Sequence, residues 1–272
     1  MNRAGDVCLV IGVLLVATCF DSVDLLFAMG RITLLLFMGL LGKSSQLGLH
    51  MWLPDAMEGP TIVSALIHSA TMVVAGVYLL IRFSFECISD VLVMIAWVSG
   101  VTALYGGLCG VYQRDLKKVI ALSTCSQLGC MVLCCGLSAY SNGLFHIITH
   151  SFFKALVFLC FGVVIHYCVE QDTRFIGSST SVHIGLVIYD TSLGSRTGTA
   201  LLVERCGLMG FGVLSLIGCS LMSGGWSKDT IGLFIYSSSR YWELFVLLGL
   251  LTVVYSVRLL STILKDTSWQ GI

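Results

Sequence analysis

Three lysines of this 272-residue sequence lie within or beside stretches that are otherwise apolar. Lys43, Lys154 and Lys228 have mainly Leu, Ile, Val, Phe, Gly and Met around them. A charged lysine at the centre of a membrane helix costs about 3 kcal/mol on insertion scales, so ionisable residues in such segments usually have a function. Because a lysine in a medium of low dielectric constant binds its proton less tightly, these positions suggest proton transfer.

Two histidines extend this pattern around the second lysine. His146, His150 and Lys154 are four residues apart, so on a helix they share one face, with about 6 Å of rise per step. Imidazole titrates near neutral pH, and chains of ionisable groups inside a helix bundle are typical of proton relays. A metal site is the alternative, since two histidines at this spacing can bind one cation, but the lysine would repel it.

The remaining titratable residues give weaker signals. By spacing alone, His68 could connect Lys43 to the histidines through water. Asp115, Lys117 and Lys118 are expected to form a solvated loop cluster with weak ion pairing. A role for this cluster at a channel mouth is the less favoured alternative.

The composition indicates a membrane protein with several spans. The chain is 57% hydrophobic and 11% charged, with a mean hydropathy of +0.95, whereas soluble domains are about 25% charged. The net charge is zero and the basic residues form no block, which argues against nucleic acid as a partner. The twelve cysteines include no C-x-x-C pair and are interpreted as small buried apolar residues.

A membrane helix needs about 20 apolar residues, and eight runs of the sequence approach that length. They are approximately Val7 to Phe20, Ile32 to Leu53, Ile62 to Phe83, Val91 to Tyr112, Val119 to Leu137, Gly143 to Tyr167, Cys206 to Ser223 and Trp242 to Leu264. The sequence therefore predicts an all-α protein with about eight transmembrane helices.

The basic residues outside the spans predict the orientation, because they favour the cytoplasmic or matrix side. An even number of spans places both termini on one side. Eight basic residues are assigned to the side of the termini: Arg3, Arg114, Lys117, Lys118, Arg174, Arg196, Arg205 and Lys265. Three are assigned to the other side: Arg31, Arg82 and Arg240. We therefore expect both termini on the cytoplasmic or matrix side.

Two of the runs are interrupted by polar and flexible residues. The interruption in the second run follows Lys43 and contains Ser44, Ser45, Gln46 and Gly48. The interruption in the seventh contains Ser220, Ser223, Gly224, Gly225, Trp226, Ser227, Lys228 and Asp229. Paired discontinuous helices indicate an ion site in transporters, whereas glycine alone can simply allow close helix packing. The lysine beside each interruption favours a function.

Several of these segments resemble one protein family. The stretch from Gly42 to Thr61, continuing from Ile67 to Met72, resembles the signature of subunit 5 of mitochondrial NADH:ubiquinone oxidoreductase, complex I. Four further segments are also similar to it: Gln113 to Lys118, Ser123 to Gly129, Thr149 to Leu156 and Ser227 to Asp229. The resemblance covers most of residues 1 to 172 and, more weakly, 206 to 264.

The resemblance implies an antiporter-like fold of two inverted five-helix repeats, each with a broken helix, around a hydrated polar axis. Residues 1–90 would be part of the first repeat, with three helices, and residues 91–264 the second repeat, with five helices. A polar loop or insertion is expected at about 173–205, and residues 265–272 form a tail.

The resemblance also implies the roles of individual residues. The proton-pathway positions would be Lys43, His68, His146, His150, Lys154 and Lys228. Asp115, Lys117 and Asp229 would support them. FMN, iron–sulfur clusters and ubiquinone would be bound by partner subunits, since this chain shows no motif for a redox cofactor or a metal. The implied location is the mitochondrial inner membrane, with both termini on the matrix side.

The chain also departs from the family pattern. The family has about twice as many helices, so the resemblance implies a shortened or split subunit, with a separate chain and the neighbouring antiporter-like subunit as partners. The glutamate that partners the first lysine in the family has no counterpart, so the charge partner of Lys43 is expected from another chain. Without such a partner, the first half-channel would be inactive.

Two other functions stay open. A multi-subunit sodium/proton antiporter shares the lysine of the broken helix and the Trp-Leu-Pro core of the motif. A structural remnant that fills the membrane arm without transporting ions is the second, although the retained His146, His150 and Lys154 argue against it.

Overall fold

Helices form nearly all of the described chain. The computed structural model describes residues 1–19, 25–83, 89–168, 171–173, 197–238 and 241–267. The first part contains α1 (Asn2–Cys19), α2 (Leu25–Lys43), α3 (Trp52–Asp55), the 3-10 turn η1 (Ala56–Glu58), α4 (Thr61–Leu66), the π-helical turn η2 (Ile67–Thr71) and α5 (Met72–Arg82). The second contains α6 (Ser89–Tyr112), α7 (Leu116–Gly136), α8 (Tyr140–Cys168), α10 (Thr197–Ile217), α11 (Ser223–Ser238) and α12 (Trp242–Thr267).

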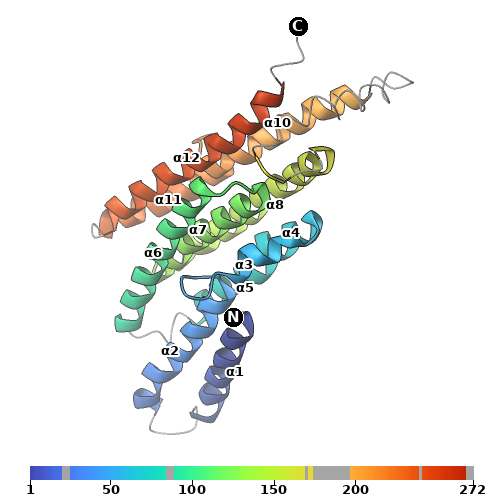
Figure 1. The fold of residues 1–272 in the computed structure, drawn as a ribbon. Helices are drawn as coiled ribbons and strands as arrows, with labels where there is room; N and C mark the ends of the chain where they lie inside the picture. Colours follow the sequence, from blue (N-terminus) through green and yellow to red (C-terminus); the bar gives the residue numbers. More distant parts are fainter. Residues whose placement is uncertain (20–24, 84–88, 169–170, 174–196, 239–240, 268–272) are drawn as a thin grey trace.

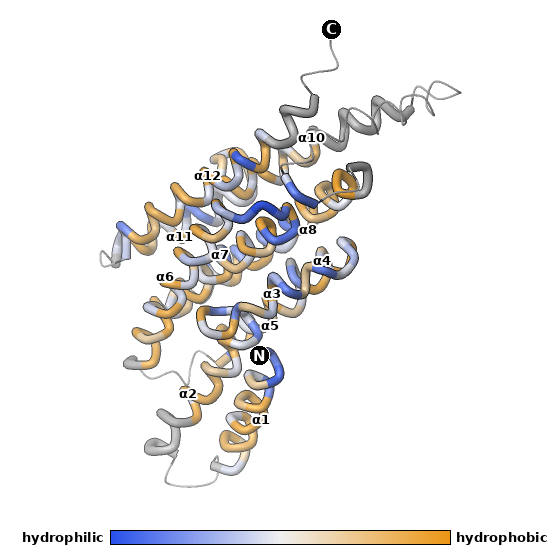
Figure 2. Tube along the Cα trace, viewed as in Figure 1, coloured by the Kyte–Doolittle hydropathy of each residue, from blue (hydrophilic) through white to orange (hydrophobic). Residues whose placement is uncertain are grey.

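The long helices run roughly along a common direction. The start of α1 and the end of α12 are each at the upper end of their helix in the view of Figure 1. Figure 2 shows that hydrophilic residues are concentrated in the connecting segments and that most of the described helical residues are hydrophobic. Four of the described helices are long and apolar enough to cross a membrane by themselves: Val91–Tyr112, Leu116–Gly136, Tyr140–Ile165 and Trp242–Ser261. This arrangement confirms the predicted helical membrane fold, whereas the number of eight crossings stays a prediction.

Three shorter apolar helices accompany these four: Ile32–Lys43, Met72–Arg82 and Gly207–Ile217. Two of them stop at irregular segments inside the apolar region. We call these segments the first break (residues 44–51, between α2 and α3) and the second break (residues 218–222, between α10 and α11). Irregular backbone in a membrane is tolerated only where protein or a wet cavity covers it.

The boundaries of the seventh run differ from the prediction. The sequence suggested a run ending at Ser223 and an interruption that included Lys228, but α11 already begins at Ser223 and Lys228 lies in its second turn. Residues 197–205 were expected to be a loop and instead form the first turns of α10. Polar Thr and Gly residues obscured this helix start. The rest of the expected loop, residues 174–196, lies outside the described residues.

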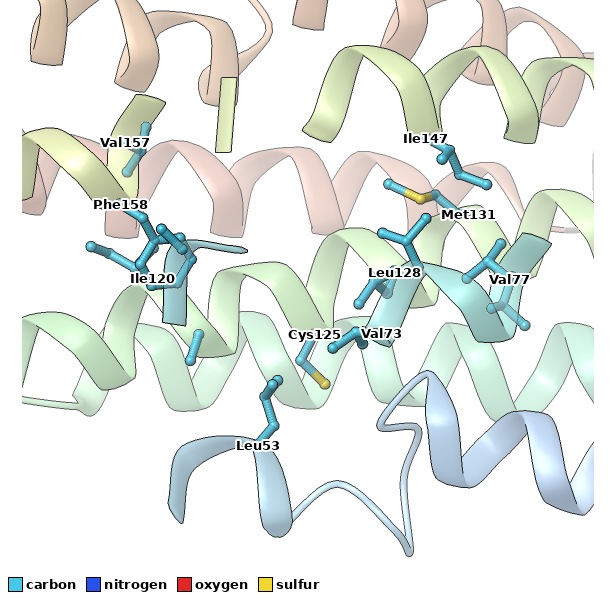
Figure 3. Close-up of a cluster of buried hydrophobic side chains, with 14 of the residues drawn as sticks. Leu53, Val73, Val77, Ile120, Cys125, Leu128, Met131, Ile147, Val157 and Phe158 are labelled. Carbon is cyan, nitrogen blue, oxygen red and sulfur yellow. The ribbon is translucent and has the colours of Figure 1, made fainter. Parts of the chain in front are cut away.

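Helix α7 forms the centre of the molecule. Its apolar length is fully enclosed, and it packs against α6, α8 and α5. Figure 3 shows part of the main buried cluster, in which Leu128 and Met131 of α7 lie near Val77 of α5 and Ile147 of α8. The same helix carries Ser123 and Gln127. A helix enclosed on every side can therefore present polar groups to its neighbours without exposing them to lipid.

Candidate functional site

Lys43 has a charge partner within this chain. It is the last residue of α2, and its Nζ lies 2.5 Å from the Asp6 carboxylate of α1. The side chains are 25% and 43% exposed, respectively. The expectation that the partner of Lys43 must come from another chain is therefore wrong.

Small residues explain why this ion pair forms. A Cβ atom added at Gly42 would lie 3.0 Å from Gly5 Cα, and one added at Gly39 would lie 3.0 Å from the Gly5 carbonyl oxygen. These three glycines let α1 and α2 cross at close distance, as small residues do in membrane helix pairs. Asp6, next to Gly5, is thereby brought to the end of α2.

The first break is polar and closely packed. Ser45 has a φ of 48°, which is unusual for a residue with a side chain. Its carbonyl accepts a hydrogen bond from the Cys125 thiol of α7, at 3.3 Å. The hydroxyl of Thr102 on α6 donates to the Gln46 side chain. The break is thus held by α6 and α7, and its polar groups face protein.

His68 lies in the π-helical turn η2, which packs against α8. The residue is 6% exposed, and its Nδ1 has no hydrogen-bond partner among the described groups. Its ring lies 5.8 Å from the ring of Trp52. Such π-helical turns occur frequently at functional sites, and here the turn carries a buried imidazole.

The side chains of His146, His150 and Lys154, which we call the His/Lys ladder, are fully buried on α8. The rings of the two histidines lie 6.1 Å apart, as one helical turn requires. The Nδ1 of His146 lies 2.8 Å from the Ser227 hydroxyl, and its Nε2 lies 3.2 Å from Gln127 Oε1. His146 therefore connects α8 to both α11 and α7.

The other two members of the ladder differ in their partners. The Nζ of Lys154 donates a 2.5 Å hydrogen bond to the Ser123 hydroxyl of α7. Both ring nitrogens of His150 are buried without a hydrogen-bond partner among the described groups. The Phe153 ring packs edge-on against His150, at 5.2 Å. Buried polar groups are nearly always hydrogen-bonded to protein or water, so the two ring nitrogens of His150 are an exception among the described groups.

Lys228 is bound by the end of a helix. Its Nζ donates to the carbonyl oxygens of Leu216, at 2.6 Å, and Ile217, at 3.3 Å. The last carbonyls of a helix lack partners within it and carry partial negative charge. The ammonium therefore complements the C-terminal end of α10, and Ser227, the preceding residue, contacts the ladder.

Two glycines allow Lys228 to reach the end of α10. A Cβ at Gly224 would lie 1.9 Å from the Ser215 carbonyl oxygen, and one at Gly225 would lie 2.2 Å from that of Cys219. No side chain fits at either distance. The Gly-Gly pair thus lets the first turn of α11 pass against the end of α10, which positions Lys228 at the free carbonyls.

The supporting residues lie at the rim and behave differently from one another. Asp115 and Lys118 form an ion pair at 3.3 Å, with about a third of each side chain exposed, as expected for a solvated pair. Lys117, however, is 6% exposed and donates to the Gly59 carbonyl at 3.1 Å. Its predicted solvation is wrong, because α7 begins at Leu116 and carries Lys117 inward. Asp229 is exposed.

The structure thus brings four of the six sequence-predicted pathway residues together and leaves two apart. The ladder and Lys228 are connected through Ser227, whereas the contacts described for Lys43 and His68 are with Asp6 and Trp52. Sequence reasoning assigned no role to Asp6, Ser123, Gln127 or Ser227. Ser123 and Gln127 are four residues apart on an apolar helix, so they share one face of it. That spacing could have indicated a polar stripe that faces other helices. Among the described residues, no group of three His, Cys, Asp or Glu side chains could hold a metal ion.

A protein-family model covers almost the whole chain. The model described as "NADH:quinone oxidoreductase/Mrp antiporter, TM" matches residues 1–256. NADH-ubiquinone oxidoreductase chain 5 of Acanthamoeba castellanii is 47% identical over 86% of this chain and 34% of its own length. Chain 5 of Metridium senile is 45% identical over 98% of this chain and 44% of its own length. NADH-quinone oxidoreductase subunit L of Rickettsia felis is 42% identical over 96% of this chain and 41% of its own length.

Solved structures give the same fold. The Mrp complex from Dietzia sp. DQ12-45-1b matches with a TM-score of 0.73 and 27% identity, over 97% of this chain and 29% of that one. A chain of the archaeal membrane-bound sulfane sulfur reductase matches with a TM-score of 0.77 and 19% identity, over 96% of this chain and 54% of that one. This chain therefore spans about two fifths of the length of the curated relatives it matches.

Proposed function

Because the chain belongs to the NADH:quinone oxidoreductase/Mrp antiporter transmembrane family, we propose that it is a proton-translocating subunit of the membrane arm of respiratory complex I. In this role it moves protons along a buried Lys/His axis, and the movement is coupled electrostatically to quinone reduction elsewhere in the complex. The chain would be a subunit of the NADH:ubiquinone reductase without a redox centre of its own. The comparisons favour this assignment because the curated relatives include proteins named NADH-ubiquinone oxidoreductase chain 5.

The burial of the ladder is the observation that carries the proposal. His146, His150 and Lys154 are fully enclosed, at the centre of an apolar bundle. Burying ionisable groups costs free energy unless they are paired, so such groups are rare in apolar bundles and usually have a function. The partners of His146 and Lys154 are serine and glutamine side chains, which can hydrogen-bond either protonation state and which leave the charge free to change. A purely structural filler would not need this arrangement.

Each pathway residue receives a role in the proposal. Lys43 and Asp6 form the loading site at the first break, and His68 follows at η2. The ladder connects the two halves, and Lys228 at the end of α10 is the exit-side group. Residues 1–90 and 91–264 then correspond to parts of two antiporter-like repeats. Asp115, Lys117 and Asp229 support the path at its rim.

The proposed location is the mitochondrial inner membrane, with both termini on the matrix side. The excess of basic residues on the side assigned to the termini supports this orientation. The proposed partners are the lipid bilayer and the other membrane-arm subunits, including a neighbouring antiporter-like subunit. FMN, iron–sulfur clusters and ubiquinone would be bound by subunits other than this one.

Replacement of Lys228 by Met tests the proposal. In membrane vesicles that contain the assembled complex, Lys228→Met should abolish most of the protons moved per NADH oxidised, since methionine fills similar space without binding a proton. Arg82→Met is the matched control, because Arg82 is an exposed residue in the last turn of α5. Proton transport that is equal in both variants would refute the proposal.

A second function is favoured by one observation, the likeness to the Mrp complex at a TM-score of 0.73. In that case the chain would exchange protons for sodium in a multi-subunit antiporter. The two functions differ in their requirement for NADH. Transport driven by a sodium gradient in vesicles without NADH, and lost in Lys228→Met, would favour the antiporter.

A further inference from the structure

The hydroxyl group of Ser227 lies where α11 meets the His/Lys ladder. The side chain is 0% exposed, and its oxygen has three neighbours on two helices. His146 Nδ1 lies 2.8 Å away and Thr149 Oγ1 lies 3.0 Å away, both on α8. The Gly224 carbonyl oxygen, in the first turn of α11, lies 3.2 Å away. A hydroxyl group carries a single hydrogen, so it cannot donate to His146 and to Gly224 at the same time.

The opposite side of the His146 ring fixes the proton of one nitrogen. Nε2 lies 3.2 Å from Gln127 Oε1, and an amide oxygen only accepts hydrogen bonds. Nε2 must therefore carry a proton for this contact to be a hydrogen bond. A proton that the ring gains or loses while this bond persists is then at Nδ1, on the side of Ser227.

The neutral ring of His146 keeps all of these contacts when Ser227 donates to it. With its only proton on Nε2, the ring has a lone pair on Nδ1, which accepts the hydrogen of the Ser227 hydroxyl. Thr149 in turn donates to the Ser227 oxygen. The result is a chain of hydrogen bonds from Thr149 to Gln127 in which each donor has an acceptor.

The charged ring keeps the same contacts after one hydrogen atom has turned. A proton that binds Nδ1 makes this nitrogen a donor to the Ser227 oxygen, which has two lone pairs and can still accept from Thr149. The Ser227 hydrogen then turns from Nδ1 to the Gly224 carbonyl oxygen, at 3.2 Å. No bond within Ser227 breaks and no heavy atom has to move. When the proton leaves Nδ1, the hydrogen turns back.

We propose that Ser227 is a positioning residue whose hydroxyl group switches between His146 and Gly224, so that His146 gains and loses a proton at Nδ1 without a rearrangement of its neighbours. The inference rests on the proposed proton pathway, and it names the atom of His146 at which the proton is exchanged. A buried charge without a hydrogen-bond partner is costly. The switch gives the imidazolium a partner as well as the neutral ring.

A serine hydroxyl that donates to a carbonyl of its own helix is common and needs no function. Ser256 of α12 is an example, since it is 0% exposed and donates to the Val253 carbonyl, three residues earlier, at 2.9 Å. The pair of Ser227 and Gly224 has the same spacing. Ser227 differs from Ser256 in its contact with the His146 ring, so Ser256 is the matched control.

Ser227→Ala tests the inference, because it removes the hydroxyl group and favours the same helix. In the assembled complex, the rate of proton transport should fall on the order of tenfold, the effect of leaving the Nδ1 proton without an acceptor. Turnover-induced infrared difference spectra should lose the imidazolium bands that are also absent in His146→Gln. Ser256→Ala should keep both the rate and the bands. Thr149→Val should lower the rate less than Ser227→Ala does, because the Ser227 hydroxyl remains.

A double-mutant comparison makes the test specific for His146. Because His146→Gln removes the ring, adding Ser227→Ala to it should cause no further loss of the residual rate. Independent losses would overturn the inference, as would an unchanged rate in Ser227→Ala or a slower rate with the imidazolium bands intact. Unmodified complex without imidazolium bands from His146 would overturn it too. If Ser227→Ala fails to assemble while Ser256→Ala assembles, the hydroxyl serves folding and the inference is also refuted.

These outcomes can be distinguished from a failure of the proposed function. If Lys228→Met stops transport while Ser227→Ala does not change it, the pathway stands and only the role of Ser227 is refuted. If Lys228→Met leaves transport intact, the pathway itself is refuted.

Discussion

The two breaks hold their lysines by different physical means. At the first break, Lys43 pairs with the carboxylate of Asp6, and both side chains are partly exposed. At the second break, the hydrogen-bond partners of Lys228 among the described groups are neutral carbonyl oxygens at the end of α10. The first ammonium is therefore stabilised by a full opposite charge and the second by a helix terminus.

This difference decides how each site can be tested. A helix terminus contributes about 0.3 to 2 kcal/mol, and a partly exposed ion pair contributes about 0 to 1 kcal/mol. The partner of Lys43 is removed by neutralising one carboxylate, whereas the partners of Lys228 are removed by moving α11 away from the end of α10.

The largest effect, on the assembly of the complex, is expected for a substitution at Gly224, where α11 packs directly against the backbone of α10. Gly224→Ala would put a Cβ atom 1.9 Å from the Ser215 carbonyl oxygen, so α11 would have to move away from α10 and Lys228 would lose its carbonyls. Overpacking of this kind costs about 1 to 3 kcal/mol or more. We expect little assembled complex, measured by native gel electrophoresis.

Gly207→Ala on α10 is the control for that variant, because a Cβ there would meet no atom within 4 Å. It should assemble like the unmodified protein, or slightly better, since alanine favours a helix by about 1 kcal/mol relative to glycine. Equal assembly of both variants would show that α11 does not need its close approach to α10.

A smaller effect is expected at the first break, and it should appear in transport more than in assembly. Asp6→Asn keeps a hydrogen-bond acceptor but removes the charge that holds the Lys43 ammonium. Partly exposed ion pairs contribute about 0 to 1 kcal/mol to stability, so the amount of assembled complex should stay nearly constant. The rate of proton transport per complex should fall about tenfold, as a loss of 1.4 kcal/mol implies.

Asp6→Glu is the conservative counterpart, and it should retain more transport than Asp6→Asn because the charge remains. If the asparagine variant transports protons at the full rate, Asp6 is only a packing contact and the contrast between the two lysines is lost. Lys43→Met combined with Asp6→Asn should be no worse than Lys43→Met alone.

The sequence predicted the residues that share one helix better than those that meet across helices. The spacing of His146, His150 and Lys154 and the one-turn distance between the histidine rings agree, because helical geometry fixes both. The polar interruption after Lys43 also marks a real break. In each case the signal lies within a few consecutive residues.

Contacts between distant segments could not be read in this way. The approach of Asp6 to Lys43 depends on three glycines on two helices, and that of Lys228 to Leu216 depends on the Gly224–Gly225 pair. Close packing of this kind follows from the shapes of two surfaces together. Lys117 shows the same limit, since its burial depends on where α7 begins and on the position of Gly59.

The smallest effect concerns the backbone of the two breaks. Gly48 and Gly218 both have positive φ, at 93° and 96°, where a side chain costs about 1 to 2 kcal/mol. A Cβ at Gly48 would meet no atom within 4 Å, whereas one at Gly218 would lie 3.0 Å from Lys228 Cδ. We expect both alanine variants to lower the thermal stability of the complex by a similar few degrees. Only Gly218→Ala should also slow transport, by less than about tenfold, because the flexible lysine can shift by a few tenths of an ångström. Equal transport in the two variants would show that the position of Lys228 at the end of α10 tolerates such a shift, and that its function depends on the charge alone.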